Sequence, residues 1–369
     1  MSAPDFAARR NKLIRRLKPA GISSLLVSSE SNVRYLTGFT GDSSWLYVSP
    51  DATVLISDSR YSRQITNECS DIDVEIRGVG KSMSEATMKV VKAARSTQLG
   101  IEGNHLTVAQ HAALASRIES ASLVVTDGLT EQLRVIKDQW EIAEIRKAVL
   151  QAERGITVTR ARLRHDQTES DIRFDLEASM RDFGASGPAF EPVVGVGPTA
   201  SLPHAHAGHL RVEASSLLLV DWGAQTDAGY RSDITRVLFT GRITKKMQSV
   251  YTIVLTAQQE AIRSIRPGAV CKDVDAVARG IIADAGYGRR FGHALGHGIG
   301  LDIHEAVRLG PETEETLKPG MIVTVEPGIY LDGRFGIRIE DDVLVTRDGY
   351  EVLTSVPREF DEAVVDFLA

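Results

Sequence analysis

The sequence is poor in cysteine and has neither a long apolar run nor an excess of positive charge. Its two cysteines, Cys69 and Cys271, lie far apart and provide neither a disulfide framework nor a cysteine-rich zinc site. This cysteine content fits a reducing compartment, so we expect a cytoplasmic location. No segment approaches the roughly 18 consecutive apolar residues of a membrane span. The basic N-terminal segment lacks the apolar centre of a secretory signal, and we expect no membrane partner.

The charge balance and the composition are those of a folded globular protein. Lys and Arg total 43 against 49 for Asp and Glu, and this mild acidity argues against nucleic acid as a partner. Hydrophobic residues make up 43% of the 369 positions, which is enough for a substantial core. At about 150 residues per domain, this length predicts two or three domains.

The first part of the chain alternates short apolar runs with helical patterns. We expect strands at 22–27, 46–49 and 53–56, and helices at 82–96 and 108–120. This mixture predicts a self-contained α/β domain over residues 1–130. A long amphipathic helix that begins at Lys137 then introduces a second domain over residues 131–369.

The second domain contains a weak internal repeat. Residues 171–184 and 273–286 both read as a helix that begins at an aspartate and ends at a glycine. Another helical stretch precedes each segment, and glycine-rich loops and strand pairs follow it. This pattern suits a duplicated α+β unit with a site between its halves, although chance similarity of two amphipathic helices remains an alternative.

Two aspartates interrupt one predicted strand pair of this domain. Asp221 ends the apolar run 217–220, and Asp233 lies in the returning strand 230–239. In a hairpin centred near Asp227 the two would face each other, with Cβ atoms about 4.5–5.5 Å apart. Two buried carboxylates repel each other unless a proton or a cation lies between them. We therefore expect a metal at this position.

A second predicted strand pair, 322–330 with 336–346, carries Glu326 and Glu340. Arg338 shares a face with Glu340, because side chains alternate along a strand. A single glutamate in such a strand is usually exposed at a sheet edge. Two carboxylates in each of two apolar strand pairs make that explanation much weaker.

Histidines gather in two loops. The segment 291–305 (FGHALGHGIGLDIHE) carries His293, His297 and His304 among glycines that let the backbone approach a site closely. One histidine with four carboxylates is an oxygen-rich set for two divalent ions, which would lie about 3.5–4 Å apart and share a water. A water that ionises there becomes a hydroxide nucleophile, so the set predicts hydrolysis.

The other loop, 203–209 (PHAHAGH), carries His204, His206 and His209. An HxH pair can bind zinc, but no carboxylate-bearing strand accompanies it, so we interpret this segment as an active-site loop. The sequence has no HExxH zinc motif, no GxxxxGK[ST] phosphate loop and no GxSxG nucleophile elbow.

The ordered set of five ligand-type residues resembles the metal-ligand signature of the pita-bread-fold metallopeptidases. Methionine aminopeptidase, aminopeptidase P and Xaa-Pro dipeptidase (prolidase) belong to that family. The phrases that carry the resemblance are SDITR, GHGIGLDIHE, TVEPGIY and GIRIEDD. In the front half, NVRYLTGFTGDSSWLYV and LISDSRYSRQITNE resemble the creatinase-type N-terminal domain of the prolidase branch. Methionine aminopeptidase lacks that domain and is disfavoured.

The resemblance implies an α+β protein in which a pita-bread catalytic domain follows a smaller α/β domain. It assigns the metal ligands as Asp221, Asp233, His297, Glu326 and Glu340. Within this set, Asp221 would chelate one ion, Asp233 and Glu340 would bridge both, and Glu326 would also move the proton of the bridging water. The two aspartates are twelve positions apart, where the family usually has eleven. We expect the hairpin turn to absorb the extra residue, near Ala228.

The resemblance also implies roles around the metals. His304 would steady the oxyanion and His204 would contact substrate near the scissile bond. His293 and Arg338 would line the proline side of the cleft. Manganese is the expected metal, with cobalt, zinc and iron as alternatives, and the chain is expected to form a homodimer.

The predicted activity is hydrolysis of the Xaa-Pro bond in dipeptides, or at the N-terminus of short peptides, by a metal-bridging hydroxide. An Xaa-Pro aminopeptidase acting on longer peptides is the nearest alternative. A metal-independent creatinase-like amidinohydrolase and a non-catalytic binding module are alternatives of other classes. Both resemble proteins that have lost metal ligands, whereas all five are present here.

Overall fold

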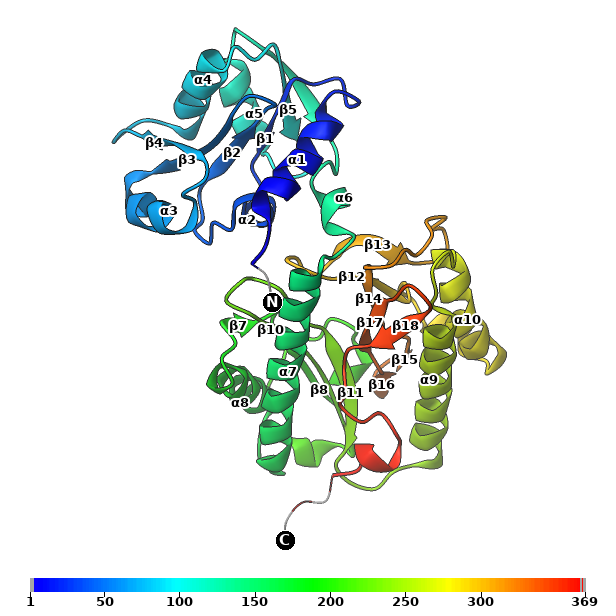
Figure 1. The fold of residues 1–369 in the computed structure, drawn as a ribbon. Helices are drawn as coiled ribbons and strands as arrows, with labels where there is room; N and C mark the ends of the chain where they lie inside the picture. Colours follow the sequence, from blue (N-terminus) through cyan, green and yellow to red (C-terminus); the bar gives the residue numbers. More distant parts are fainter. Residues whose placement is uncertain (1–2, 366, 368–369) are drawn as a thin grey trace. The chain divides into compact units, whose positions relative to one another are not determined.

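Helices and strands are mixed in both halves of the chain, which confirms the predicted α+β class. The computed structural model describes residues 3–365 and 367, and it divides into two units, Met1–Arg134 and Val135–Ala369 (Figure 1). Within this described range, no helix is both long enough and apolar enough to cross a membrane.

The first unit contains a six-stranded sheet with the order β4-β3-β2-β1-β5-β6. Strand β2 pairs antiparallel with β1 and β3, whereas β5 pairs parallel with β1 and β6. The strands are β1 (Ser24–Val27), β2 (Trp45–Val48), β3 (Thr53–Asp58), β4 (Asp73–Arg77), β5 (Gln98–Glu102) and β6 (Ser122–Thr126). The helices are α1 (Phe6–Leu17), α2 (Glu30–Thr37), α3 (Ser62–Glu68), α4 (Met83–Ala93), α5 (Val108–Ala115) and α6 (Glu131–Arg134).

The second unit contains four long helices in two packed pairs, α7 with α8 and α9 with α10. Figure 1 shows one pair on each side of the strands of this unit. Helices α8 and α10 each have 14 residues and follow a longer helix, in agreement with the predicted duplication. The bounds are α7 (Gln139–Ala161), α8 (Glu169–Asp182), α9 (Lys245–Ser264) and α10 (Cys271–Asp284).

Two sheets fill the space between these helices. One has three strands in the order β11-β9-β8, and the other has five in the order β13-β12-β14-β17-β18. The first consists of β8 (Val193–Val196), β9 (Leu217–Trp222) and β11 (Ile234–Phe239). The second consists of β12 (Gly296–Gly298), β13 (Glu305–Leu309), β14 (Ile322–Val325), β17 (Asp341–Val345) and β18 (Tyr350–Val352). Two short pairs complete the unit: β7 (Gly187–Pro188) with β10 (Ala224–Gln225), and β15 (Gly328–Leu331) with β16 (Phe335–Arg338).

The hairpin of β9 and β11 corrects one prediction. Asp221 pairs with Thr235 and does not face Asp233. The turn is centred on Ala228, because Gly229 adopts a left-handed φ of 88° and Thr226 N donates to Tyr230 O at 2.9 Å. The pairing is therefore displaced by two residues from the predicted one. A displacement of two keeps both aspartates on the same face of the sheet.

The prediction of one continuous strand pair around Glu326 and Glu340 was also wrong. Residues 322–325 pair with β17 in the five-stranded sheet, whereas 328–331 pair with β16 in a separate two-stranded sheet. Pro327, which has no N–H to donate, lies at the break. The two pairings share one register, Val325 with Asp341 and Gly328 with Arg338, so Glu326 and Glu340 lie opposite each other where the strands are interrupted.

Candidate metal centre

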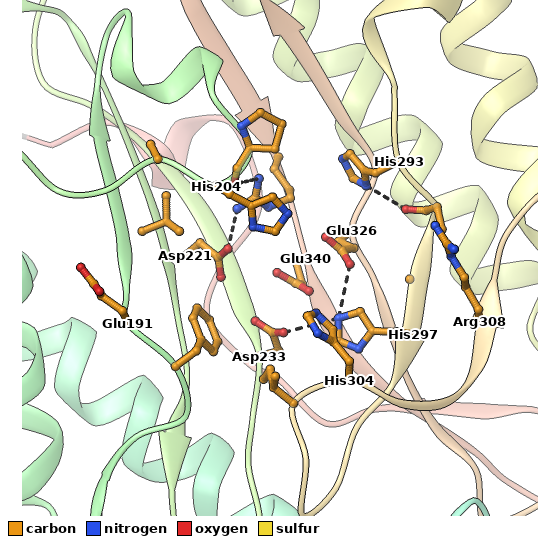
Figure 2. A pocket seen from close by; sticks show the side chains of 18 of the residues that line it. Glu191, His204, Asp221, Asp233, His293, His297, His304, Arg308, Glu326 and Glu340 are labelled. Atoms are coloured by element: carbon orange, nitrogen blue, oxygen red, sulfur yellow. Dashed lines mark hydrogen bonds and ion pairs between the residues drawn. The ribbon is translucent and has the colours of Figure 1, made fainter. Parts of the chain in front are cut away.

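The strand ends of the second unit open into a cavity of about 590 Å³. Every residue predicted for the site lines it: Asp221, Asp233, His297, Glu326, Glu340, His204, His293, His304 and Arg338. In Figure 2 the four carboxylates turn toward one space, with the rings of His297 and His304 beside it. Residues from both halves of the duplicated unit thus contribute to one site.

Asp233, His297 and Glu340 form the centre of this arrangement. Each offers a ligand atom, and these atoms all lie within 4.8 Å of one another. The Nε2 atom of His297 is 3.7 Å from Asp233 Oδ2 and 3.5 Å from Glu326 Oε1. Among the described residues, this is the one group of three or more His, Cys, Asp or Glu side chains with such spacing. The HxH pair in the loop 203–209 does not belong to such a group.

Thr235, which the sequence reasoning missed, lies between the ligand strands. It pairs with Asp221 in β9 and forms an isolated antiparallel bridge with Glu340. Its hydroxyl donates to Glu340 Oε2 at 2.6 Å and accepts from Arg338 Nε at 3.0 Å. Its position two residues after Asp233, on the same face of the strand, was the available signal.

The electrostatics of the cluster call for cations. Burial, followed by repulsion from neighbouring carboxylates, raises the pKa of Asp233 and of Glu340 well above the usual range. Burial likewise raises the pKa of Glu326 to about 8. In addition, Asp221 Oδ1 is buried without a hydrogen-bond partner in the described residues. Oxygen ligands of this kind fit divalent cations, which would relieve the repulsion and satisfy the unpaired oxygen.

His297 supports the same conclusion. Its Nδ1 lies 3.0 Å from Gly298 O, a pure acceptor, so we assign the ring proton to Nδ1. Burial lowers the pKa of His297 to about 4, and the ring is therefore neutral near pH 7. The lone pair on Nε2 then points toward Asp233 and Glu326, an arrangement that is repulsive without a cation and favourable with one.

A hydrogen-bonded chain closes another side of the cavity. Arg338 Nη1 donates to Tyr330 Oη at 2.8 Å, and Tyr330 Oη is 3.0 Å from His293 Nε2. His293 Nδ1 lies 2.8 Å from Ala294 O, so its Nε2 accepts the Tyr330 proton. Arg338 Nη2 donates to Asp221 Oδ2 at 2.5 Å. The sequence did not identify Tyr330 as the link between His293 and Arg338, the two residues predicted for the proline side.

The remaining histidines lie nearer to solvent. The ring of His304 is 4.3 Å from that of His297, centroid to centroid, and burial lowers the pKa of His304. His204 is exposed and lies in the loop that borders the cavity. His206 from the same loop also lines the cavity, with Nδ1 3.8 Å from Glu191 Oε1.

Comparison with known proteins covers both units. The family model of metallopeptidase family M24 matches residues 143–347, and the creatinase/prolidase N-terminal domain matches residues 9–136. A protein named Xaa-Pro dipeptidase from Pyrococcus horikoshii is 34% identical over 94% of this chain and 97% of its own length. These matches confirm the predicted fold of a creatinase-type domain followed by a pita-bread catalytic domain.

Solved structures of related proteins superpose on more than nine tenths of this chain. An Xaa-Pro dipeptidase from Bacillus anthracis superposes with a TM-score of 0.92 at 35% identity, over 96% of this chain and 99% of that one. An X-Pro aminopeptidase from Thermotoga maritima superposes with a TM-score of 0.86 at 35% identity, over 93% of this chain and 99% of that one.

Proposed function

Because the chain belongs to metallopeptidase family M24, we propose that it hydrolyses the Xaa-Pro bond of dipeptides with two divalent ions. The observation that carries the proposal is the cluster of four carboxylates with a neutral histidine whose lone pair faces two of them. Relatives named Xaa-Pro dipeptidase supply the substrate class. Manganese is the proposed metal, and a homodimer is the proposed assembly.

The proposed ligands are Asp221, Asp233, His297, Glu326 and Glu340. When bound, two divalent ions would polarise the scissile carbonyl and lower the pKa of a shared water. Thr235 holds one oxygen of Glu340 by a hydrogen bond of 2.6 Å and so fixes the orientation of this carboxylate in the cavity. Arg338 orients Asp221 in the same way.

Proton transfer is assigned to Glu326. Its carboxyl lines the cavity beside the proposed ligand His297, with Oε1 3.5 Å from His297 Nε2, where a carboxylate can accept a proton from a bound water. We assign oxyanion contact to His304, whose ring lies against that of the proposed ligand His297. His204, on the exposed loop, is assigned to the substrate near the scissile bond.

The proline side is assigned to His293 and Arg338. Both nitrogens of His293 already have partners, so its ring contributes a wall rather than a donor. The donors of Arg338 go to Thr235, Tyr330, Asp221 and the Pro203 carbonyl. An Xaa-Pro bond has no N–H for a peptidase to grip, so recognition by the shape of such a wall suits it.

The second candidate is an Xaa-Pro aminopeptidase that accepts longer peptides. The superposition with an X-Pro aminopeptidase at 35% identity favours it. The two candidates differ in whether the substrate must end in a free proline carboxylate. Because four of the five N–H donors of Arg338 already have partners in the protein, we assign binding of that carboxylate to Arg308, an exposed arginine on the cavity wall.

The test is a metal-dependent assay on matched peptides. Protein stripped with a chelator and reloaded with manganese is expected to hold about two ions per chain and to cleave Ala-Pro. Ala-Ala, which lacks the proline, serves as the control and should resist cleavage. Cleavage of Ala-Pro with little cleavage of Ala-Pro-Ala supports the dipeptidase, and the reverse supports the aminopeptidase. A chain that holds no metal and cleaves neither peptide contradicts the proposal.

A further inference from the structure

Lys137 forms a buried ion pair with the loop that carries His304. It lies in the short segment between α6 and α7, directly before Asp138, the residue that caps α7. Its Nζ is 2.8 Å from Glu305 Oε2, and the two side chains are only 1% and 5% exposed. The backbone N of Lys137 also donates to Gly320 O at 2.8 Å. The ammonium therefore projects from a fixed piece of backbone.

Glu305 connects this ammonium to the loop. Its other oxygen, Oε1, accepts from Leu301 N at 2.9 Å and from Asp302 N at 3.3 Å. Gly300 allows this contact, because a Cβ there would lie 2.6 Å from the same oxygen. The Glu305 carboxylate thus holds both ends of the segment 301–305, since it belongs to one end and binds the backbone of the other.

His304 lies within this closed segment, next to Glu305. The loop leaves β12 just after His297 and returns as β13, where Glu305 pairs with Gly298 across a bulge. The two imidazole rings consequently meet at 4.3 Å. A movement of Glu305 would displace His304 relative to His297 and to the cavity.

We propose that Lys137 is a positioning residue that acts through Glu305 to fix His304 in the cavity. The inference rests on the proposed function, since it takes the role of His304 from there. A buried ion pair contributes little net stability compared with an apolar pair of similar size. The pair does, however, hold Lys137 and Glu305 in one arrangement, because separating them would leave an unpaired charge in the protein interior, which is unfavourable.

The test is a double-mutant cycle of Lys137→Met with His304→Ala, assayed on Ala-Pro after manganese loading. Lys137→Met should lower kcat roughly 10-fold, the lower end of the losses typical for residues that support a metal site, with little change in KM or metal content. In the His304→Ala background the same change should lower kcat by less than about 2-fold, because the group it positions is gone. Lys137→Arg, which keeps the charge, should recover part of the activity.

A matched control is Lys272→Met, which removes an exposed ion pair of 2.6 Å with Glu314, and neither residue of that pair lines the cavity. It should leave kcat unchanged. If Lys137→Met does not fold, Glu305→Gln replaces it in the cycle, since the amide keeps an acceptor for Leu301 N while it weakens the pair.

The outcomes separate this inference from the proposed function. Equal losses of kcat in both backgrounds, or wild-type kcat in Lys137→Met, overturn the positioning role of Lys137. A His304→Ala variant with wild-type kcat removes instead the role assigned to His304, and the inference falls with it. A wild-type protein that does not cleave Ala-Pro at all contradicts the proposed function.

Discussion

Thr235→Val should weaken metal binding without altering the fold. Valine has nearly the volume of threonine, so the change removes only the hydroxyl. That hydroxyl donates to Glu340 Oε2 at 2.6 Å and accepts from Arg338 Nε at 3.0 Å, and all three side chains are buried. The variant leaves one proposed ligand and one guanidinium each short of a hydrogen bond.

The magnitude follows from these two contacts. A hydrogen bond to a charged group contributes about 1.5–3 kcal/mol. The bond to Glu340 bears directly on a ligand oxygen, so its loss should appear as weaker metal affinity by roughly 10–100-fold, which is about 1.4–2.8 kcal/mol. The bond from Arg338 should contribute mainly to stability, because that guanidinium keeps its contacts with Asp221 and Tyr330.

The assay is manganese titration of the chelator-treated protein by calorimetry, together with kcat at saturating metal. Thr235→Ser is the matched control, since it keeps the hydroxyl and loses only a methyl group, and it should bind manganese like the wild type. Equal manganese affinity of the valine variant and the wild type would refute the reasoning. It would mean that the hydroxyl does not determine how Glu340 presents its oxygens.

Three further predictions concern the same cavity. Asp233→Ala should abolish metal binding and turnover. It should leave the Tm of the metal-free protein equal or higher, because one of several buried carboxylates that repel one another is removed. A marked fall in that Tm would contradict this prediction. The raised pKa of Glu326, to about 8, means that the contribution of Glu326 to the stability of the metal-free fold is fully present below about pH 4 and is lost as pH rises toward 8. The increase in Tm caused by metal should therefore be larger at pH 8 than at pH 5.5, and an increase independent of pH would count against the carboxylate cluster. Arg308→Met should raise KM for Ala-Pro at least about 10-fold, which is the effect of losing one charge-assisted hydrogen bond. The KM for Ala-Pro-Ala should stay nearly constant. Equal effects on both peptides would exclude Arg308 as the group that binds the proline carboxylate.

The carboxylates of the site could be predicted from the sequence because they lie next to strands that are otherwise apolar. Strands β11, β14 and β17 are buried along their whole length. A carboxylate next to such a strand is unfavourable unless something compensates it. The segments around Asp233, Glu326 and Glu340 therefore indicate a cation from the sequence alone.

The supporting contacts could not be found in that way. Thr235 and Glu340 are 105 positions apart, and Lys137 and Glu305 are 168 apart. Threonine in a strand and lysine before a helix are common and carry no local conflict. Their partners depend on how separate strands and loops come together, and periodicity describes only one segment at a time.

The two register errors show why the candidate site was nevertheless predictable. Side chains alternate between the faces of a strand, so an error of one residue would have turned Asp233 away from Asp221. The turn at Gly229 displaced the pairing by two residues, and both aspartates stayed on the face that lines the cavity. Likewise, the break at Pro327 divided one expected strand pair between two sheets, but the shared register kept Glu326 opposite Glu340. What the sequence determines is the face on which each ligand lies. The distances between ligands, and hence which carboxylates can bridge two ions, depend on turns and breaks that alternation does not detect.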